Sequence, residues 1–115
     1  MLGSASGIMV YDEELARRIR KLLPRATEKR MFGGMGLMER GHLVAGVSHA
    51  DLVVRVVPEE TDRWLREDGA HQMMEGRSMT GWVKVSASAL KDDRTLKAWV
   101  ERSRSATRSL PEKEK

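Results

Sequence analysis

Residues 27–57 alternate between short apolar runs and tight-turn sequences, and this spacing restricts the chain to few folds. Gly33-Gly34 interrupts the first run, and Glu39-Arg40-Gly41-His42 and Ser48-His49-Ala50 are typical of tight turns. The strand-like runs between them are Met35–Met38, Leu43–Val47 and the β-branched Leu52–Val57. Closely spaced strands joined by short turns predict an antiparallel meander.

Helix signals stand on both sides of this meander. Asp12–Leu23 carries apolar residues at helical spacing and ends before Pro24, Pro58 opens a second helix, and Asp92 or Asp93 caps a last one. Two further strands are expected at His71–Met74 and at Gly81–Val85. The prediction is an α+β domain in α-β-β-β-α-β-β-α order, with helices packed on an antiparallel sheet of five to six strands.

The length of 115 residues fits one domain, which we expect to span residues 9–111. Residues 1–8 are expected to be a disordered leader or tag remnant, and residues 112–115 a charged tail. Only 4% of the residues are aromatic, so aliphatic side chains must build the core with the three Trp as anchors. Trp64 and Trp99 are expected to anchor two of the helices.

Composition excludes several classes of function. The chain has no Cys, which rules out disulfides, thiolate nucleophiles and zinc–sulfur sites. No apolar run approaches the roughly 18 residues of a membrane span, and the first ten residues lack the basic region of a secretory signal. We therefore expect a cytoplasmic protein that does not contact membranes.

No catalytic or metal-binding pattern stands out. The three His lack zinc-protease spacing, His42 and His49 are expected at the surface because they lie in or near turns, and no Ser sits in a Gly-x-Ser-x-Gly elbow. Glu59-Glu60 and Asp92-Asp93 stand at helix starts, where the helix dipole accounts for them. The Gly-rich run at 31–36 is followed by no helix and no Lys-Ser or Lys-Thr, so it indicates a bend between strands. We expect no enzyme activity, metal or cofactor.

Two arginines, Arg55 and Arg77, are candidates for binding a negatively charged group. Arg55 interrupts an otherwise apolar strand, and Arg77 lies in a Gly-flanked loop before Trp82. An unpaired buried charge is costly, so Arg55 is expected to reach one of the protein's own carboxylates, such as Glu28 or Asp51. Alternatively, Arg55 and Arg77 converge on one group of a small anionic ligand or substrate.

The positive charge is unevenly distributed. The net charge is +4, yet residues 12–30 and 91–115 each carry an excess of three positive charges, and residues 31–90 an excess of two negative ones. Basic helices at both ends suit a nucleic-acid-binding accessory protein. The other interpretation of so small an excess of positive charge is a solvated helix face that carries charges of both signs.

Several motifs recur in an order that resembles a known family. They are Tyr11-Asp12-Glu13-Glu14-Leu15, Lys29-Arg30-Met31-Phe32-Gly33-Gly34, Gly46-Val47-Ser48, Leu52-Val53-Val54-Arg55-Val56 and Gly76-Arg77-Ser78-Met79-Thr80-Gly81-Trp82-Val83-Lys84-Val85. Together they resemble the N-terminal domain of the TfoX/Sxy competence regulators, over essentially the whole domain. Ser78, Thr80 and Leu37 depart from the family's usual residues. The family's regulators also carry a second, helical C-terminal domain, which we do not expect in this protein.

The resemblance implies a secretion-chaperone-like α+β fold, often dimeric, without established catalytic residues. We therefore predict a stand-alone, non-enzymatic regulatory or protein-interaction domain. Its expected partners are a protein of the transcription machinery and a second copy of the chain. The candidate binding residues, taken from the motifs, are Phe32, Gly33, Gly34, Arg55, Gly76, Arg77, Gly81 and Trp82.

Overall fold

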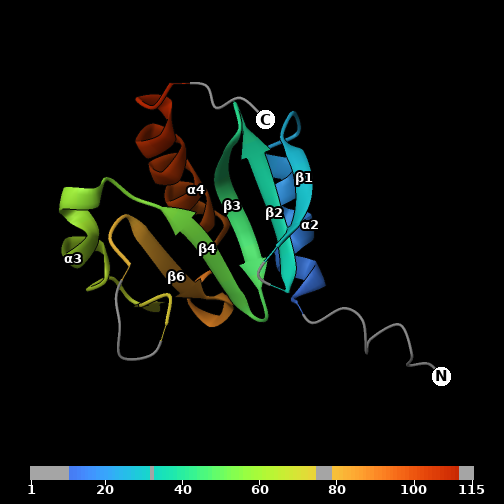
Figure 1. Ribbon diagram of the computed structural model, residues 1–115. Coiled ribbons are helices and arrows are strands. Elements are labelled where there is room, and N and C mark those ends of the chain that lie inside the picture. The colour runs from blue at the N-terminus through green and yellow to red at the C-terminus, as the bar shows by residue number, and fades with distance from the viewer. Residues whose placement is uncertain (1–10, 32, 75–78, 112–115) are drawn as a thin grey trace.

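The computed structural model describes residues 11–31, 33–74 and 79–111 (Figure 1). They form one six-stranded antiparallel sheet and three α-helices, which confirms the predicted α+β class. The elements in chain order are α2 (Glu13–Leu22), β1 (Thr27–Met31), β2 (Gly34–Glu39), β3 (His42–Ser48), β4 (Asp51–Arg55), α3 (Thr61–Trp64), β5 (Ala70–His71), β6 (Trp82–Ser86) and α4 (Asp93–Arg108). The expected leader at 1–8 and tail at 112–115 lie outside the described residues.

The first four strands form the predicted meander. The spatial order is β1-β2-β3-β4-β6-β5, and every neighbouring pair is antiparallel. The predicted turn between β2 and β3 is confirmed, with φ of 55° at Arg40 and 83° at Gly41. Strand β6 returns beside β4, and the short β5 forms the edge next to β6, so the central strands β3 and β4 have neighbours on both sides.

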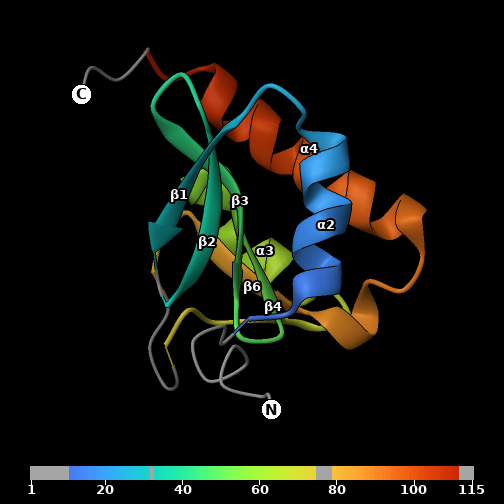
Figure 2. The same cartoon turned by 90° about the vertical axis from the view of Figure 1, so that its right-hand side faces the viewer.

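Helices α2 and α4 cover one face of the sheet (Figure 2). Their apolar sides are fully buried, as at Leu15, Ile19 and Leu96, and they pack against sheet residues such as Val54 and Val83. The Asp12 carboxylate accepts a hydrogen bond from Leu15 N at 3.0 Å, and Asp92 accepts one from Arg94 N at 2.9 Å. Both aspartates therefore cap their helices, and the cap at Asp92 is one of the two that the sequence predicts.

Polar contacts fix α4 across the sheet. The fully buried Ser103 hydroxyl donates to the Val44 carbonyl at 2.5 Å and accepts the backbone N–H of Arg55 at 3.0 Å. At the C-terminal end of α4, the Arg40 guanidinium donates to the Thr107 carbonyl at 3.2 Å and to the Leu110 carbonyl just beyond the helix. The bond to Thr107 satisfies one of the carbonyls that the last turn of a helix leaves without partners.

The helix expected from Pro58 is shorter than the sequence suggests. A single 3₁₀ turn at Pro58–Glu60 leads into α3, which has four residues. Trp64 is half-buried and meets Trp99 of α4 edge to face, with ring centroids 6.1 Å apart. The two helix anchors predicted from the sequence thus pack against each other. Within the described ranges, no helix is long and apolar enough to cross a membrane.

Candidate functional site

Arg55 and Trp82 face each other across β4 and β6. They are direct partners in the strand register, and the Arg55 guanidinium carbon lies 4.6 Å from the centre of the Trp82 ring. Their neighbours Val54 and Val83 point into the core and are fully buried, so Arg55 and Trp82 occupy the sheet face opposite the helices. A cation over an indole face at this distance is attractive, and the pair defines the candidate site.

The Arg55 side chain has no carboxylate partner among the described residues. Its Nε is buried without a hydrogen bond, and burial lowers the pKa of the guanidinium below its usual value. The expectation that Glu28 or Asp51 neutralises Arg55 is wrong. Glu28 instead pairs with Arg20 at 2.9 Å, and Asp51 lies 3.4 Å from the His71 ring. The positive charge of Arg55 is therefore available to an external group.

Gly81 holds the start of β6 beside this pair. Its N–H donates to the Thr61 hydroxyl at 2.7 Å, and its carbonyl accepts the Val56 N–H at 3.0 Å. The Thr61 hydroxyl in turn donates to the Pro58 carbonyl at 2.7 Å. Gly81 thus joins β6 to the segment after β4 and positions Trp82, so its role is structural.

Gly33 and Gly34 lie away from Arg55 and Trp82. Gly34 begins β2 and packs against the Val47 end of β3, whereas Arg55 ends β4 at the opposite end of the sheet. The structure therefore brings Arg55, Gly81 and Trp82 together and separates the two glycines from them. Phe32, Gly76 and Arg77 lie outside the described residues. Convergence of Arg55 and Arg77 on one ligand stays a prediction for the same reason.

Three large apolar side chains are exposed, and two of them, Val57 and Met79, lie close to Arg55 and Trp82. Val57, Met74 and Met79 are 38%, 52% and 41% exposed and are the large exposed apolar residues of the part of the chain that the structure describes. Val57 follows β4 by two residues, and Met79 accepts the Trp82 N–H through its carbonyl at 3.0 Å. This exposure is not evident from the sequence. The sequence assigns Val57 to a strand over residues 52–57, but β4 ends at Arg55. Met79 is named only as part of a family motif.

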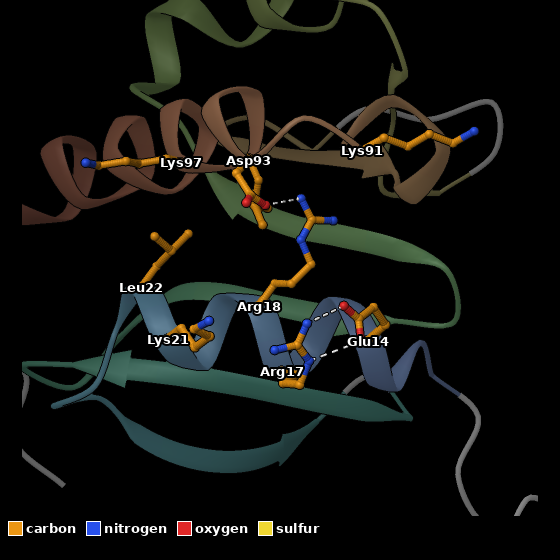
Figure 3. Close-up of a pocket in the computed structure, with 9 residues that line it drawn as sticks. Glu14, Arg17, Arg18, Lys21, Leu22, Lys91, Asp93 and Lys97 are labelled. Atoms are coloured by element: carbon orange, nitrogen blue, oxygen red, sulfur yellow. Dashed lines mark hydrogen bonds and ion pairs between the residues drawn. The ribbon is translucent and has the colours of Figure 1, made fainter.

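A second candidate region lies between α2 and α4 (Figure 3). It is a groove of about 560 Å³ lined by five cations and two acids. Arg18 of α2 donates to Asp93 of α4 at 2.9 Å and so bridges the groove. Arg17 donates to Glu14 at 3.1 Å, and this bond holds the pKa of the Glu14 carboxyl below its usual value. The sequence showed basic ends but not that the two ends share one groove.

Neither a metal centre nor a nucleophilic site emerges within the described ranges. No group of three His, Asp or Glu residues there could hold a metal ion. The expectation of an exposed His42 is wrong, because it is 8% exposed and its Nε2 donates to the Pro111 carbonyl at 2.7 Å. The glycine-rich segment joins β1 to β2 rather than a strand to a helix, so it lacks the geometry of a phosphate-binding loop.

Replacing Arg55 with Met should leave the domain as stable as before. The substitution removes a cation–π contact, but it also removes the cost of a buried, unpaired polar atom, and these effects are of similar size. We expect the free energy of unfolding, measured by urea titration, to change by less than about 1 kcal/mol. Arg104→Met is the matched control, because Arg104 pairs with Glu39 and Glu101 and its loss should destabilise more. A larger loss of stability for Arg55→Met than for Arg104→Met would show that Arg55 has a structural role.

The chain also matches a protein-family model. The model is described as the TfoX N-terminal domain, and it matches residues 18–107. This range begins within α2, ends within α4 and includes every strand of the sheet. No curated protein and no solved structure matches the chain.

Proposed function

Since the chain belongs to the TfoX N-terminal domain family, we propose that it is a non-enzymatic protein-interaction domain that acts in regulation. Its proposed partner is a protein of the transcription machinery, which places its action in the cytoplasm. The working surface is the Arg55–Trp82 surface, defined as Arg55, Trp82, Val57 and Met79. The carrying observation is that two exposed apolar side chains, Val57 and Met79, lie beside an arginine that has no carboxylate partner among the described residues.

The chemistry of this surface specifies its occupant. Exposed apolar side chains favour an apolar anchor, and Arg55 together with the nearby Lys84 of β6 favours a carboxylate beside that anchor. Trp and Arg are also the residues most often central to protein interfaces. The proposed occupant is therefore a segment of another protein that presents an acidic residue next to an apolar one.

Site-specific crosslinking tests this assignment. A photoreactive benzoylphenylalanine at position 79 should give one discrete crosslinked product in cells of the source organism, because Met79 is exposed at the surface. The same group at Lys29, an exposed residue of β1, should not give that product. Adding Arg55→Met to the position-79 variant should reduce the product by at least about tenfold, as expected for loss of an interfacial charge contact.

The yield and the mass of the crosslinked product show whether the proposed surface and its proposed occupant are correct. An equal yield from positions 29 and 79, or a product insensitive to Arg55→Met, would contradict the proposed surface. A product of twice the 13.0 kDa chain mass would place a second copy there and contradict the assignment to another protein. The homodimer expected from the family resemblance would then have its interface at this surface.

A further inference from the structure

We propose that the groove between α2 and α4 binds the phosphate backbone of duplex nucleic acid. The groove is lined by Arg17, Arg18, Lys21, Lys91 and Lys97, with Glu14 and Asp93 as the acids. This leaves an excess of three positive charges in a space of about 560 Å³. Neither the family match nor the Arg55–Trp82 surface requires such a site, so the inference is independent of the proposed function.

The two acids of the groove already have partners. Glu14 is bonded to Arg17, and Asp93 is bonded to Arg18. The three lysines are exposed and have no hydrogen bond or ion pair with any described residue. Their charges are therefore the uncompensated ones. Figure 3 shows Lys21 on α2, with Lys91 and Lys97 extending in opposite directions on the other side of the groove. Lys21 belongs to α2, whereas Lys91 and Lys97 lie just before and within α4.

Several cations of the same helices outside the groove are engaged within the protein. Arg20 pairs with Glu28, and Arg104 pairs with Glu39. Arg102 lies over the rings of Trp64 and Trp99, with its guanidinium carbon 3.7 and 4.5 Å from the ring centres. Lys21 and Lys97, the lysines of these two helices, both line the groove, whereas the exposed Arg94 and Arg108 of α4, whose side chains have no partner among the described residues, lie outside it. This distribution is what an anion-binding surface needs.

The groove's lining identifies the kind of anion. It contains no aromatic side chain, so it offers no stacking platform for the bases of a single strand. Its apolar residues are Leu22 and Leu96, which is little apolar surface for anchoring a peptide. Binding must then come almost entirely from charge. A duplex, with one phosphate charge per about 1.7 Å of axis, gives three lysines neighbouring phosphates to contact.

Salt dependence measures these contacts directly. Three phosphate contacts release counterions and give a slope of about −2.7 for the logarithm of the binding constant against the logarithm of salt concentration. Raising NaCl from 50 to 200 mM should therefore weaken binding about 40-fold. The probe is a fluorescein-labelled 20-base-pair DNA duplex, followed by fluorescence anisotropy with the full chain.

Matched variants connect the slope to the groove. Lys21→Gln, Lys91→Gln and Lys97→Gln together should bring the slope close to zero, and each alone should reduce it by about 0.9. The control combines Lys29→Gln, Arg30→Gln and Arg66→Gln, which remove the same charge from exposed positions outside the groove. The control should keep the slope near its original value. Circular dichroism checks that each variant is folded, and the single variants preserve the test if the triple variant is not.

Four results would overturn the inference. The first is a duplex that does not bind at 50 mM NaCl, and the second is an equal loss of slope in the groove and control variants. The third is polyglutamate that binds as tightly as the duplex with the same dependence on the groove lysines, which would assign the groove to an acidic polypeptide. Inorganic phosphate that competes at millimolar concentration with no difference between the two triple variants would show nonspecific screening and contradict the site as well. None of these results bears on crosslinking at position 79. The inference about the groove can therefore be disproved without affecting the proposed function, and the reverse also holds.

Discussion

Gly34→Ala should prevent folding or lower the free energy of unfolding by at least about 3 kcal/mol, at the upper end of the usual cost of overpacking. A Cβ at Gly34 would lie 1.8 Å from the Val47 carbonyl oxygen and 2.9 Å from its carbonyl carbon. Both atoms belong to the backbone of the buried strand β3, so no side chain can rotate away to make room. The two strands would have to separate where β2 begins.

Gly33→Ala is the matched control for this prediction. Gly33 is exposed and has φ of 72°, so an alanine there meets only the backbone strain of the left-handed region, about 1–2 kcal/mol. Urea unfolding of the two variants measures the difference, and the soluble folded yield replaces it if Gly34→Ala does not fold. Equal stability of the two variants would contradict the close contact between Gly34 and Val47.

The meander was predictable because its determinants are local. The turn at Arg40 and Gly41 follows from a few neighbouring residues, and the alternation of Val83 and Val85 with Trp82 indicates which side of β6 is buried. The Asp12 and Asp92 caps are likewise local, since each carboxylate bonds a backbone N–H two or three residues later. Such features need no knowledge of the rest of the chain.

The segment after β4 was predicted less well because distant contacts shape it. The pattern from Pro58 onward suits a longer helix, but Thr61 holds Gly81, which lies 20 residues further along the chain. Trp64 packs against Trp99 and donates its ring N–H to Glu60 at 3.0 Å. These contacts draw α3 against β6 and α4, and the helix ends after one turn.

The candidate sites show the same division between local and distant determinants. The sequence marks Arg55 as unusual, but its contact with Trp82 depends on β6 pairing with β4, an arrangement that no short segment encodes. The groove is joined by Arg18 and Asp93, which are 75 positions apart. The sequence shows that both ends of the chain are basic. The two ends form one groove only because α2 and α4 pack side by side on the same face of the sheet.

Trp99→Ala should lower the free energy of unfolding by about 3–5 kcal/mol, because removing a buried aromatic side chain leaves a large cavity. Trp99 is 3% exposed within the main core. Its ring also supports Arg102, whose pKa is lowered by burial between Trp99 and Trp64. The substitution would therefore open the core and leave the Arg102 guanidinium with one aromatic face instead of two.

A comparison with Trp64→Ala tests whether burial sets this cost. Trp64 is half-buried, so its loss should cost less than that of Trp99. Urea unfolding of both variants and of the double variant completes a thermodynamic cycle. Because the rings pack edge to face, the cycle should give a coupling of about 0.5–1.5 kcal/mol. A larger effect at Trp64 than at Trp99 would mean that burial does not set the cost, and additive effects would mean that the contact between the two rings does not hold α3 against α4. The Arg55–Trp82 surface, which Thr61 of α3 helps to hold through Gly81, would then need another source of rigidity.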